Sequence, residues 1–316
     1  MTEHTLRIGS RKSELALEQT YIIERLLKET YPHLKTEIIT SDTLGDKNLI
    51  SPLQAFGGKG VFVSELEEAL LNGQIDLAVH SAKDMPAKLD PGLCIAAVSH
   101  REYPGDVFLT RNDTDLTSFK GKPFIVGTSS PRRQCFFKEC WKEIWEQTGT
   151  GPVPELIFET LRGNVHTRLN KLKDGLYDGI ILAQAGLTRL GISENEDLHF
   201  YSLDPKRFIP AGGQGILAVE AKAGSTAARL CEKIDVPKTH ICLDAERGVL
   251  AYLNAGCHEP IGVYASIEGN DLTIRAAGAV SGTSHTAVKH VCITGSGEKE
   301  ELERMIEEIG KGLGRR

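Results

Sequence analysis

Short apolar runs alternate with helical spacing of apolar residues along the first third of the chain. Runs at 6–8, 36–39 and 75–79 predict strands of a sheet. Between the first two runs, apolar side chains recur at helical spacing from about Ser13 onwards, and Pro32 ends that helix because proline cannot continue it. This alternation indicates an α/β domain built on a central sheet.

The same alternation begins again after Pro104, and two segments of the new part echo the first. Ile8-Gly9-Ser10 resembles Val126-Gly127-Thr128, each at the end of a predicted strand. Residues 72–76 resemble residues 174–178, each leading into an apolar strand. The echoes predict two similar domains that face each other across a cleft, and such clefts commonly bind ligands.

The last quarter of the chain has a different pattern. A helix that ends at Asn254 is followed by strands and turns over 263–293 and by a charged helix over 297–314, which indicates a small α+β domain. The Gly-rich segment 209–215 leads into a strand that we interpret as a return to the first domain. The predicted domains are 1–103 with 214–236, then 104–209, and finally 237–316.

Length and composition are those of a globular protein. The chain has 316 residues, enough for two or three domains, and it is 40% hydrophobic and 25% charged. It contains no run of about 18 apolar residues, so no membrane span or membrane partner is expected. The first residues lack a basic segment followed by an apolar one, and a cytoplasmic location is therefore predicted.

Charge and cysteine usage exclude further classes. The net charge of −6 argues against a general nucleic-acid binder. Seven cysteines is an odd number, and without paired CxxC units it favours a reducing compartment over a disulfide framework. Cys135 and Cys140 share a predicted helix but do not make a zinc site, so no metal is expected.

Basic residues recur where predicted elements begin or end. Such positions bind anions in open α/β sheets, because strands end there and helix N-termini carry unpaired N–H groups. Each arginine taken alone is more simply a solvated surface charge, but the pair Arg132 and Arg133 after the strand at 124–126 indicates anion binding. The basic residues at such positions are Arg11, Lys83, Arg132, Arg133, Arg162, Arg168 and Arg189.

Two reactive side chains stand apart from the basic residues. Cys257 ends an apolar helix between Gly256 and Pro260, a setting that favours an accessible thiol suited to covalent attachment. Its neighbour His258 is poorly placed to act as its base. Asp84 is the only acid between residues 79 and 86. It is a local cap or ion-pair partner, a group that offsets a positive charge on a substrate, or a group that transfers protons.

The segment Gly57-Gly58-Lys59-Gly60 superficially resembles a phosphate loop. It lacks the GxxxxGK[ST] spacing and the strand that precedes such a loop. We interpret it instead as a lid that carries Lys59 and Phe62.

Taken in order, the motifs resemble those of the hydroxymethylbilane synthase (porphobilinogen deaminase) family. Each motif alone is weak, whereas the ordered set covers nearly the whole chain and is specific. The matching stretches are RIGSRKS (7–13), GGKGVF (57–62), HSAKDMP (80–86), GTSSPRRQ (127–134), LRGN (161–164), TRL (167–169), AGLTRLG (185–191), PAGGQG (210–215), and GC followed by PIG (256–262).

The resemblance implies a fold and an activity. The fold would be α/β, with two domains like the type II periplasmic binding proteins flanking a cleft, plus a small α+β C-terminal domain that attaches the cofactor. The activity would be that of a monomeric transferase of tetrapyrrole biosynthesis. It would condense four porphobilinogen molecules head to tail, with release of ammonia, onto a dipyrromethane joined to Cys257 by a thioether, and hydrolysis would then free hydroxymethylbilane.

The resemblance also implies roles for single residues. Asp84 would be catalytic, because loss of ammonia from porphobilinogen leaves a cation that a carboxylate can offset. The cofactor-binding residues would be Cys257, Lys83, Asp84, Ser129, Arg132, Arg133 and Arg162. The substrate-binding residues would be Arg11, Ser13, Arg168 and Arg189.

Some features depart from the family pattern. The segment 137–154, with Trp141 and Trp145, looks longer than the usual connection and predicts an extended helix. Ala255 and Glu259 flank Cys257 where the family more often has Gly and an apolar residue, and the Glu259 carboxylate is expected to raise the thiol pKa.

Two other functions compete with the synthase. A non-catalytic anion receptor on the same two-domain fold would explain the arginines but neither Cys257 nor Asp84. A cysteine-nucleophile acyl transferase would explain Cys257 but lacks a positioned base.

Overall fold

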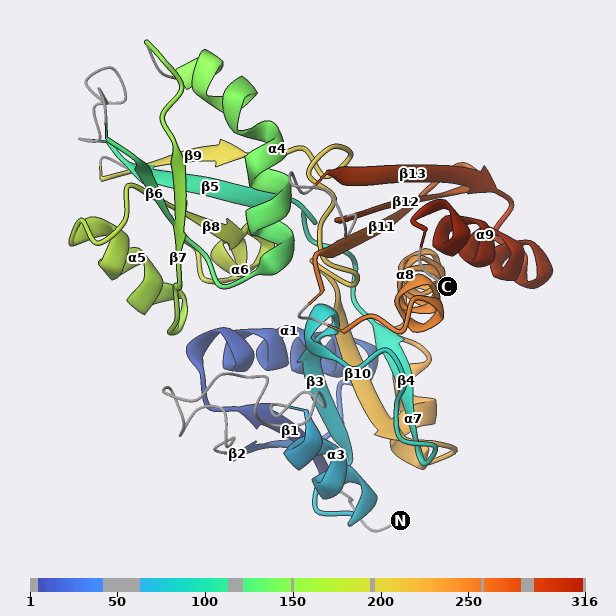
Figure 1. Ribbon diagram of the computed structural model, residues 1–316. Coiled ribbons are helices and arrows are strands. Elements are labelled where there is room, and N and C mark those ends of the chain that lie inside the picture. Colours follow the sequence, from blue (N-terminus) through green and yellow to red (C-terminus); the bar gives the residue numbers. More distant parts are fainter. Residues whose placement is uncertain are drawn as a thin grey trace. The chain divides into compact units, whose positions relative to one another are not determined.

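The structure is a computed structural model that describes residues 5–41, 63–112, 122–148, 151–193, 197–256, 259–279 and 287–314. Its chain divides into two units, Met1–Glu102 with Gly212–Cys257 and Tyr103–Ala211 with His258–Arg316. Each unit has a five-stranded sheet, and the second also contains a three-stranded sheet (Figure 1).

The sheet of the first unit is mainly parallel. Strand β1 pairs in parallel with β2 and β3, whereas β10 runs antiparallel to β3 and β4 (Figure 1). The strands lie in the order β2 (Thr36–Ser41), β1 (Leu6–Arg11), β3 (Leu77–Ser81), β10 (Leu217–Lys222) and β4 (Leu93–Val98).

Helices cover this sheet with their apolar sides. Ile23 and Leu27 of α1 pack with Ile8 and Val79 of the strands, as the helical spacing of the sequence predicts. Leu243 of α8 packs on another cluster beside the sheet. The helical elements of the unit are α1 (Glu14–Thr30), α3 (Ser64–Leu71), the 3₁₀ turn η2 (Ala82–Asp84), α7 (Thr226–Cys231) and α8 (Pro237–Tyr252).

The five-stranded sheet of the second unit repeats this topology. Strand β6 pairs in parallel with β7 and β8, and β5 runs antiparallel to β8 and β9. The strand order is β7 (Leu156–Glu159), β6 (Phe124–Gly127), β8 (Gly179–Ala183), β5 (Asp106–Arg111) and β9 (Leu198–Ser202). The accompanying helices are α4 (Pro131–Thr148), α5 (Val165–Lys173) and α6 (Gln184–Arg189).

The echoes in the sequence mark equivalent positions of the two sheets. The backbone N–H of Arg7 in β1 donates to Oδ2 of Asp76 at 2.8 Å, and the backbone N–H of Ile125 in β6 donates to Oδ2 of Asp178 at the same distance. Each aspartate directly precedes the central parallel strand, β3 or β8. The predicted pair of similar α/β domains is therefore confirmed.

The end of the chain forms the small α+β part that the sequence predicts. Strands β11 (Ile261–Glu268), β12 (Asp271–Ala279) and β13 (Val288–Gly295) form an antiparallel sheet, and α9 (Lys299–Gly312) packs on β13. Ala277 of β12 shares a core cluster with Phe136 of α4. The chain divides into two units, with α8 in the first and the three-stranded sheet in the second. The boundaries of three separate domains therefore remain a prediction.

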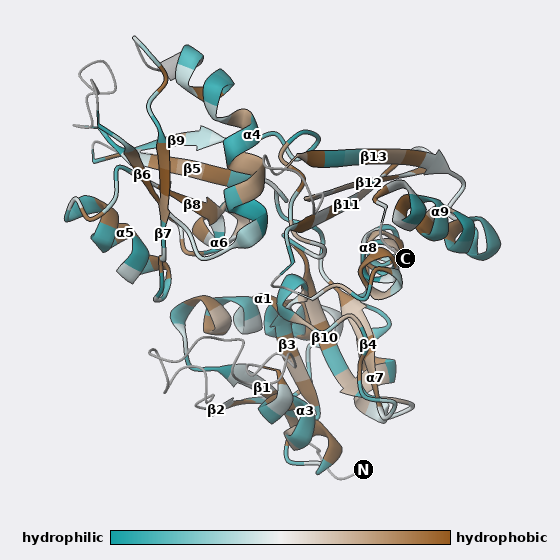
Figure 2. Cartoon of the chain, in the orientation of Figure 1, coloured by the Kyte–Doolittle hydropathy of each residue, from teal (hydrophilic) through white to brown (hydrophobic). Residues whose placement is uncertain are grey.

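The hydropathy of the residues agrees with this arrangement of strands and helices. In Figure 2 the strands β5, β6 and β8 are coloured mainly as apolar, whereas α5 and α9 alternate between hydrophilic and apolar positions. Helix α4 includes residues 137–148 of the predicted extension, and its Trp141 and Trp145 are buried against Phe124. Among the helices of the described ranges, none is long and apolar enough to cross a membrane.

Candidate active site

The predicted site residues of the first unit lie where two neighbouring parallel strands end. Arg11 is the last residue of β1, and Lys83 and Asp84 lie in the turn η2 that follows β3. Because β1 and β3 pair in parallel, their carboxyl ends meet at one edge of the sheet. Ser13 caps the N-terminus of α1 at this edge, and its hydroxyl accepts a hydrogen bond from the Ala16 N–H at 3.3 Å.

A buried glutamine that the sequence reasoning missed connects helix α1 to the end of β3. Nε2 of Gln19 in α1 donates to Oγ of Ser81, the last residue of β3, at 2.9 Å. Gln19 is buried although it is polar, which is rare for a side chain without such a partner. A polar residue on the apolar side of a predicted helix is the signal that could have identified it.

The carboxylate of Asp84 is accessible. Its side chain is exposed, and within the described part of the chain it makes no hydrogen bond or ion pair. The neighbouring Lys83 donates from Nζ to Oε1 of Gln214 at 3.3 Å. Asp84 therefore does not act as a local cap or as the partner of Lys83 in this structure, and its oxygens are accessible to a ligand.

The Gly-rich return segment lies against Lys83. Gly213 has φ +78°, and a Cβ at this position would lie 2.9 Å from the backbone nitrogen of Lys83. The fully buried carboxylate of Glu246 in α8 accepts hydrogen bonds from the Gly213 N–H and from Arg101. Arg101 Nε in turn donates to the carbonyl of Gln214 at 2.9 Å, so the segment is fastened beside the turn that carries Asp84.

The predicted residues of the second unit lie at the corresponding edge of its sheet. Ser129, Arg132 and Arg133 follow β6, and Arg162 follows β7. Arg189 is the last residue of α6, the helix that follows β8. Strands β7, β6 and β8 are parallel neighbours, so Ser129, Arg132, Arg133 and Arg162 lie at the carboxyl ends of the strands, whereas Arg189 lies one short helix further along the chain.

Arg132 and Arg133 are buried and share one carboxylate. Nη2 of Arg132 lies 2.7 Å from Oδ2 of Asp106, and Nη2 of Arg133 lies 2.8 Å from Oδ1. The remaining bonds go to the carbonyls of Ile209 and Ile181. Burial lowers the pKa of the Arg132 guanidinium, and the Asp106 carboxylate acts in the opposite direction. Their predicted role in binding the cofactor stays a prediction.

Ser129 and Arg168 hold the backbone from which Arg162 extends. Oγ of Ser129 donates to the carbonyl of Leu161 at 2.9 Å, and Nε of Arg168 donates to the carbonyl of Gly163 at 2.7 Å. The structure thus brings these three predicted residues together around one loop. Cys257, Lys59 and Phe62 lie outside the described residues.

Three other cysteines have unreactive settings. Burial raises the pKa of the Cys140 and Cys242 thiols to about 11 and that of Cys231 to about 12. Little thiolate forms at such sites near neutral pH. Cys292 is exposed. No group of three or more metal-ligating side chains occurs in the ranges that the structure describes.

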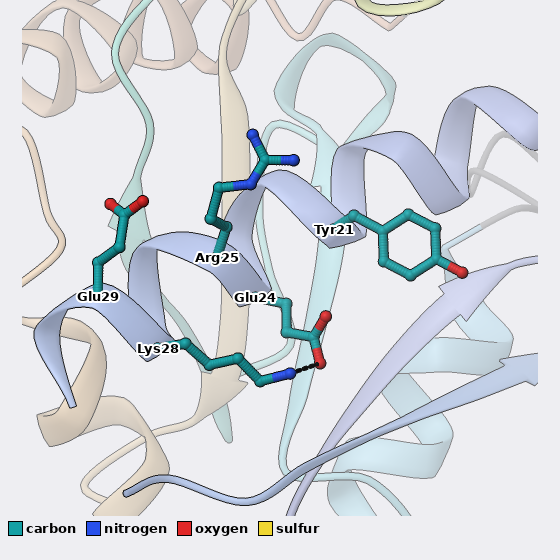
Figure 3. A pocket seen from close by; sticks show the side chains of 5 residues that line it. All are labelled: Tyr21, Glu24, Arg25, Lys28 and Glu29. Atoms are coloured by element: carbon teal, nitrogen blue, oxygen red, sulfur yellow. Dashed lines mark hydrogen bonds and ion pairs between the residues drawn. The ribbon is translucent and has the colours of Figure 1, made fainter. Parts of the chain in front are cut away.

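A surface hollow occurs on the outer side of α1, apart from these residues. Tyr21, Glu24, Arg25, Lys28 and Glu29 line it (Figure 3). Nζ of Lys28 lies 2.7 Å from Oε1 of Glu24, an exposed pair one helical turn apart. None of the predicted site residues lines this hollow, so it is a feature of the helix surface.

Comparison with known proteins identifies the family. Residues 6–229 match the dipyromethane cofactor binding domain of porphobilinogen deaminase, and residues 240–315 match its C-terminal domain. The chain belongs to the porphobilinogen deaminase family. The porphobilinogen deaminase of Roseiflexus castenholzii is 42% identical over 272 residues, which cover 86% of this chain and 84% of that protein. The porphobilinogen deaminase of Methylobacillus flagellatus is 40% identical and covers 94% of this chain and 90% of its own length.

The solved structures that match include one at low identity and low structural similarity. The substrate-binding domain of a putative molybdenum transporter from Clostridium difficile is 14% identical, with a TM-score of 0.41, over 73% of this chain and 91% of that chain. The α/β fold class with a small C-terminal sheet that the porphobilinogen deaminase resemblance implied is confirmed by the topology of the three sheets.

Proposed function

We propose that this chain condenses four porphobilinogen molecules head to tail onto a dipyrromethane held by Cys257, releases ammonia at each addition, and finally frees hydroxymethylbilane. Its membership of the porphobilinogen deaminase family supports this function. The observation that carries the assignment of the catalytic group is the exposed carboxylate of Asp84 at the edge shared by β1 and β3.

Asp84 acts on the charge that develops in the substrate. Loss of ammonia from porphobilinogen leaves a delocalised cation, and a nearby carboxylate lowers the energy of that state. The carboxylate of Asp84 has no cation of its own within the described chain, so its charge is available to the substrate. It can also accept hydrogen bonds from pyrrole N–H groups.

The residues at the strand ends fit a ligand that carries many carboxylates. Dipyrromethane, when bound, supplies the pyrrole carbon to which the first unit is added. Lys83 in the first unit and Arg162 in the second offer cations, and Ser129 in the second unit offers a hydroxyl. Arg132 and Arg133 stand at the N-terminus of α4, where helix N–H groups favour anions. Arg11, Ser13, Arg168 and Arg189 are assigned to the incoming substrate, and Lys59 and Phe62 to a lid.

Partners and location follow from the same proposal. The substrate is a small anionic molecule and the chain acts as a monomer. The absence of a nucleic-acid partner accords with the net charge of −6. We assign the chain to the cytoplasm, where its thiols stay reduced.

Intact-protein mass spectrometry combined with turnover assays tests the proposal. The purified chain is expected to carry a stable added mass of two pyrrole units and to consume porphobilinogen. Cys257→Ala should lack that mass, whereas Cys292→Ala, which removes an exposed cysteine elsewhere, should keep both mass and turnover. Asp84→Asn should lower turnover about a hundredfold or more, as loss of one electrostatic group does.

The outcomes separate the competing functions. An unmodified wild-type chain that binds porphobilinogen without consuming it would instead support the anion receptor. A transient acyl adduct on Cys257 would support the acyl transferase.

A further inference from the structure

Four consecutive backbone carbonyls in the second unit each accept a hydrogen bond from a side chain. They belong to residues 160–163, which we call the Thr160–Gly163 loop, directly after β7. The donors and distances are Tyr177 Oη to Thr160 O, 2.8 Å; Ser129 Oγ to Leu161 O, 2.9 Å; Lys171 Nζ to Arg162 O, 3.1 Å; and Arg168 Nε to Gly163 O, 2.7 Å.

This loop has no regular secondary structure of its own. Backbone carbonyls require hydrogen-bond donors. These four accept from side chains that lie after β6, in α5 and in the turn before β8. A backbone held at four successive carbonyls has little freedom to rotate. The direction in which the Arg162 side chain leaves the loop is therefore fixed by these four donors.

Two of the donors, Lys171 and Tyr177, have no role in the function proposed above. Tyr177 is buried, and its ring lies so close to Gly127 that a Cβ there would be 2.9 Å from it. Lys171 lies one turn beyond Arg168 on α5 and forms no ion pair within the described part of the chain. A lysine that bonds a carbonyl and pairs with no acid holds the backbone in place rather than neutralising a charge.

We propose that Lys171 and Tyr177 are positioning residues that act through Arg162. By holding the Thr160 and Arg162 carbonyls, they set the position from which the Arg162 guanidinium meets a ligand carboxylate. This inference rests on the proposed function, in which Arg162 binds the cofactor. Geometry matters here because a guanidinium binds a carboxylate best when two parallel hydrogen bonds form, which requires a defined direction.

The test is a double-mutant cycle with Arg162. Lys171→Met and Tyr177→Phe each remove one donor, and each is expected to raise the KM for porphobilinogen about tenfold, because small misplacements of binding groups have such effects. The fraction of chains that carry the dipyrromethane mass should fall in parallel, measured by intact-protein mass spectrometry. In an Arg162→Ala background, the same substitutions should change KM by less than about twofold, since the group they position is gone.

Matched controls separate positioning from loss of charge or general disturbance. Lys173→Met removes a lysine two residues further along α5 that pairs with Asp197 at 2.7 Å, and it should leave KM and occupancy unchanged. Tyr31→Phe removes a hydroxyl that bonds the Leu230 carbonyl at 3.1 Å in the first unit, and it should do the same. Lys171→Arg, which keeps a donor, should restore most of the affinity.

Two results would overturn the inference. One is an equal rise in KM in the wild-type and Arg162→Ala backgrounds, which would make Lys171 or Tyr177 a direct ligand. The other is wild-type KM and occupancy in both Lys171→Met and Tyr177→Phe. Either result requires an active, cofactor-loaded parent chain, whereas a parent that lacks both the added mass and turnover would refute the proposed function itself.

Discussion

Two aspartates of this chain have opposite surroundings. Asp84 is exposed and has no bonded partner in the described chain, whereas Asp106 is fully buried and holds two guanidiniums. An exposed, unpaired carboxylate is available for chemistry. A buried carboxylate between two cations is a structural requirement, because removing it leaves two charges in a poorly solvated site.

Asp106→Asn is therefore expected to destabilise the fold. Loss of one partner of a buried ion pair costs about 3 kcal/mol or more of the free energy of unfolding. Urea unfolding measures the change. The control is Asp197→Asn, which breaks the exposed pair with Lys173 and should cost less than about 1 kcal/mol. Equal losses in both variants would show that Asp106 does not stabilise the buried arginines.

The buried thiol of Cys231 makes the free energy of unfolding fall as pH rises into the alkaline range. Burial raises its pKa from the usual 9.0 to about 12, so the folded chain keeps the proton at pH values where the unfolded chain loses it. The stabilisation is complete below pH 9.0 and is lost as pH rises toward about 12.

Urea unfolding at pH 8 and pH 10 tests this effect. The stability lost between these values should be about 1 kcal/mol smaller in Cys231→Ala than in the wild-type chain. Other alkaline groups contribute equally to both proteins and cancel in the difference. Parallel pH dependences in the two proteins would contradict the assigned shift.

At the scale of elements, the segment Gly213–Gly215 precedes the return strand β10 and packs against the turn that carries Lys83 and Asp84. Glu246 and Arg101 bond the backbone of this segment, and its Gly213 lies close to the backbone of Lys83. A glycine is required at that approach both by its φ of +78° and by the lack of room for a Cβ. The position of Asp84 therefore depends on a helix and a loop far from it in the sequence.

Gly213→Ala should displace this turn. The added methyl meets the Ala82 and Lys83 backbone, so we expect a loss of about 2 kcal/mol or more in stability and a larger loss of turnover. Gly224→Ala is the matched control, because Gly224 also has positive φ, +71°, but has nothing within 4 Å of its Cβ position. That variant should lose about 1 kcal/mol and retain turnover. Similar turnover in both variants would mean that the close approach does not position Asp84.

Over the whole molecule, local patterns predicted the elements and missed the long-range bonds. Alternating apolar spacing located β1 and α1, and the echo around Asp76 and Asp178 predicted the repeated topology. Motif positions also placed Arg11, Lys83 and Asp84 directly after predicted strands, and the parallel pairing of β1 with β3 brings those strand ends to one edge of the sheet.

The missed groups are those whose partners lie far along the chain. Glu246 bonds Arg101 across 145 residues, and Gln19 bonds Ser81 across 62. No spacing rule connects such positions, because the fold alone brings them together. Arg132 and Arg133 are a further example. Their motif indicates that they bind an anion, yet only the structure shows that the Asp106 carboxylate already pairs with both guanidiniums.

The place of β10 in the first sheet has a consequence for biosynthesis. In Figure 1 the gold strand β10 lies between β3 and β4, although it follows the last strand of the second five-stranded sheet in the sequence. A ribosome therefore delivers β5 to β9 complete while β3 and β4 still lack the strand that joins them. Their open edges can pair with other chains until residues 217–222 emerge, so a pause in translation before that point exposes the nascent protein to aggregation.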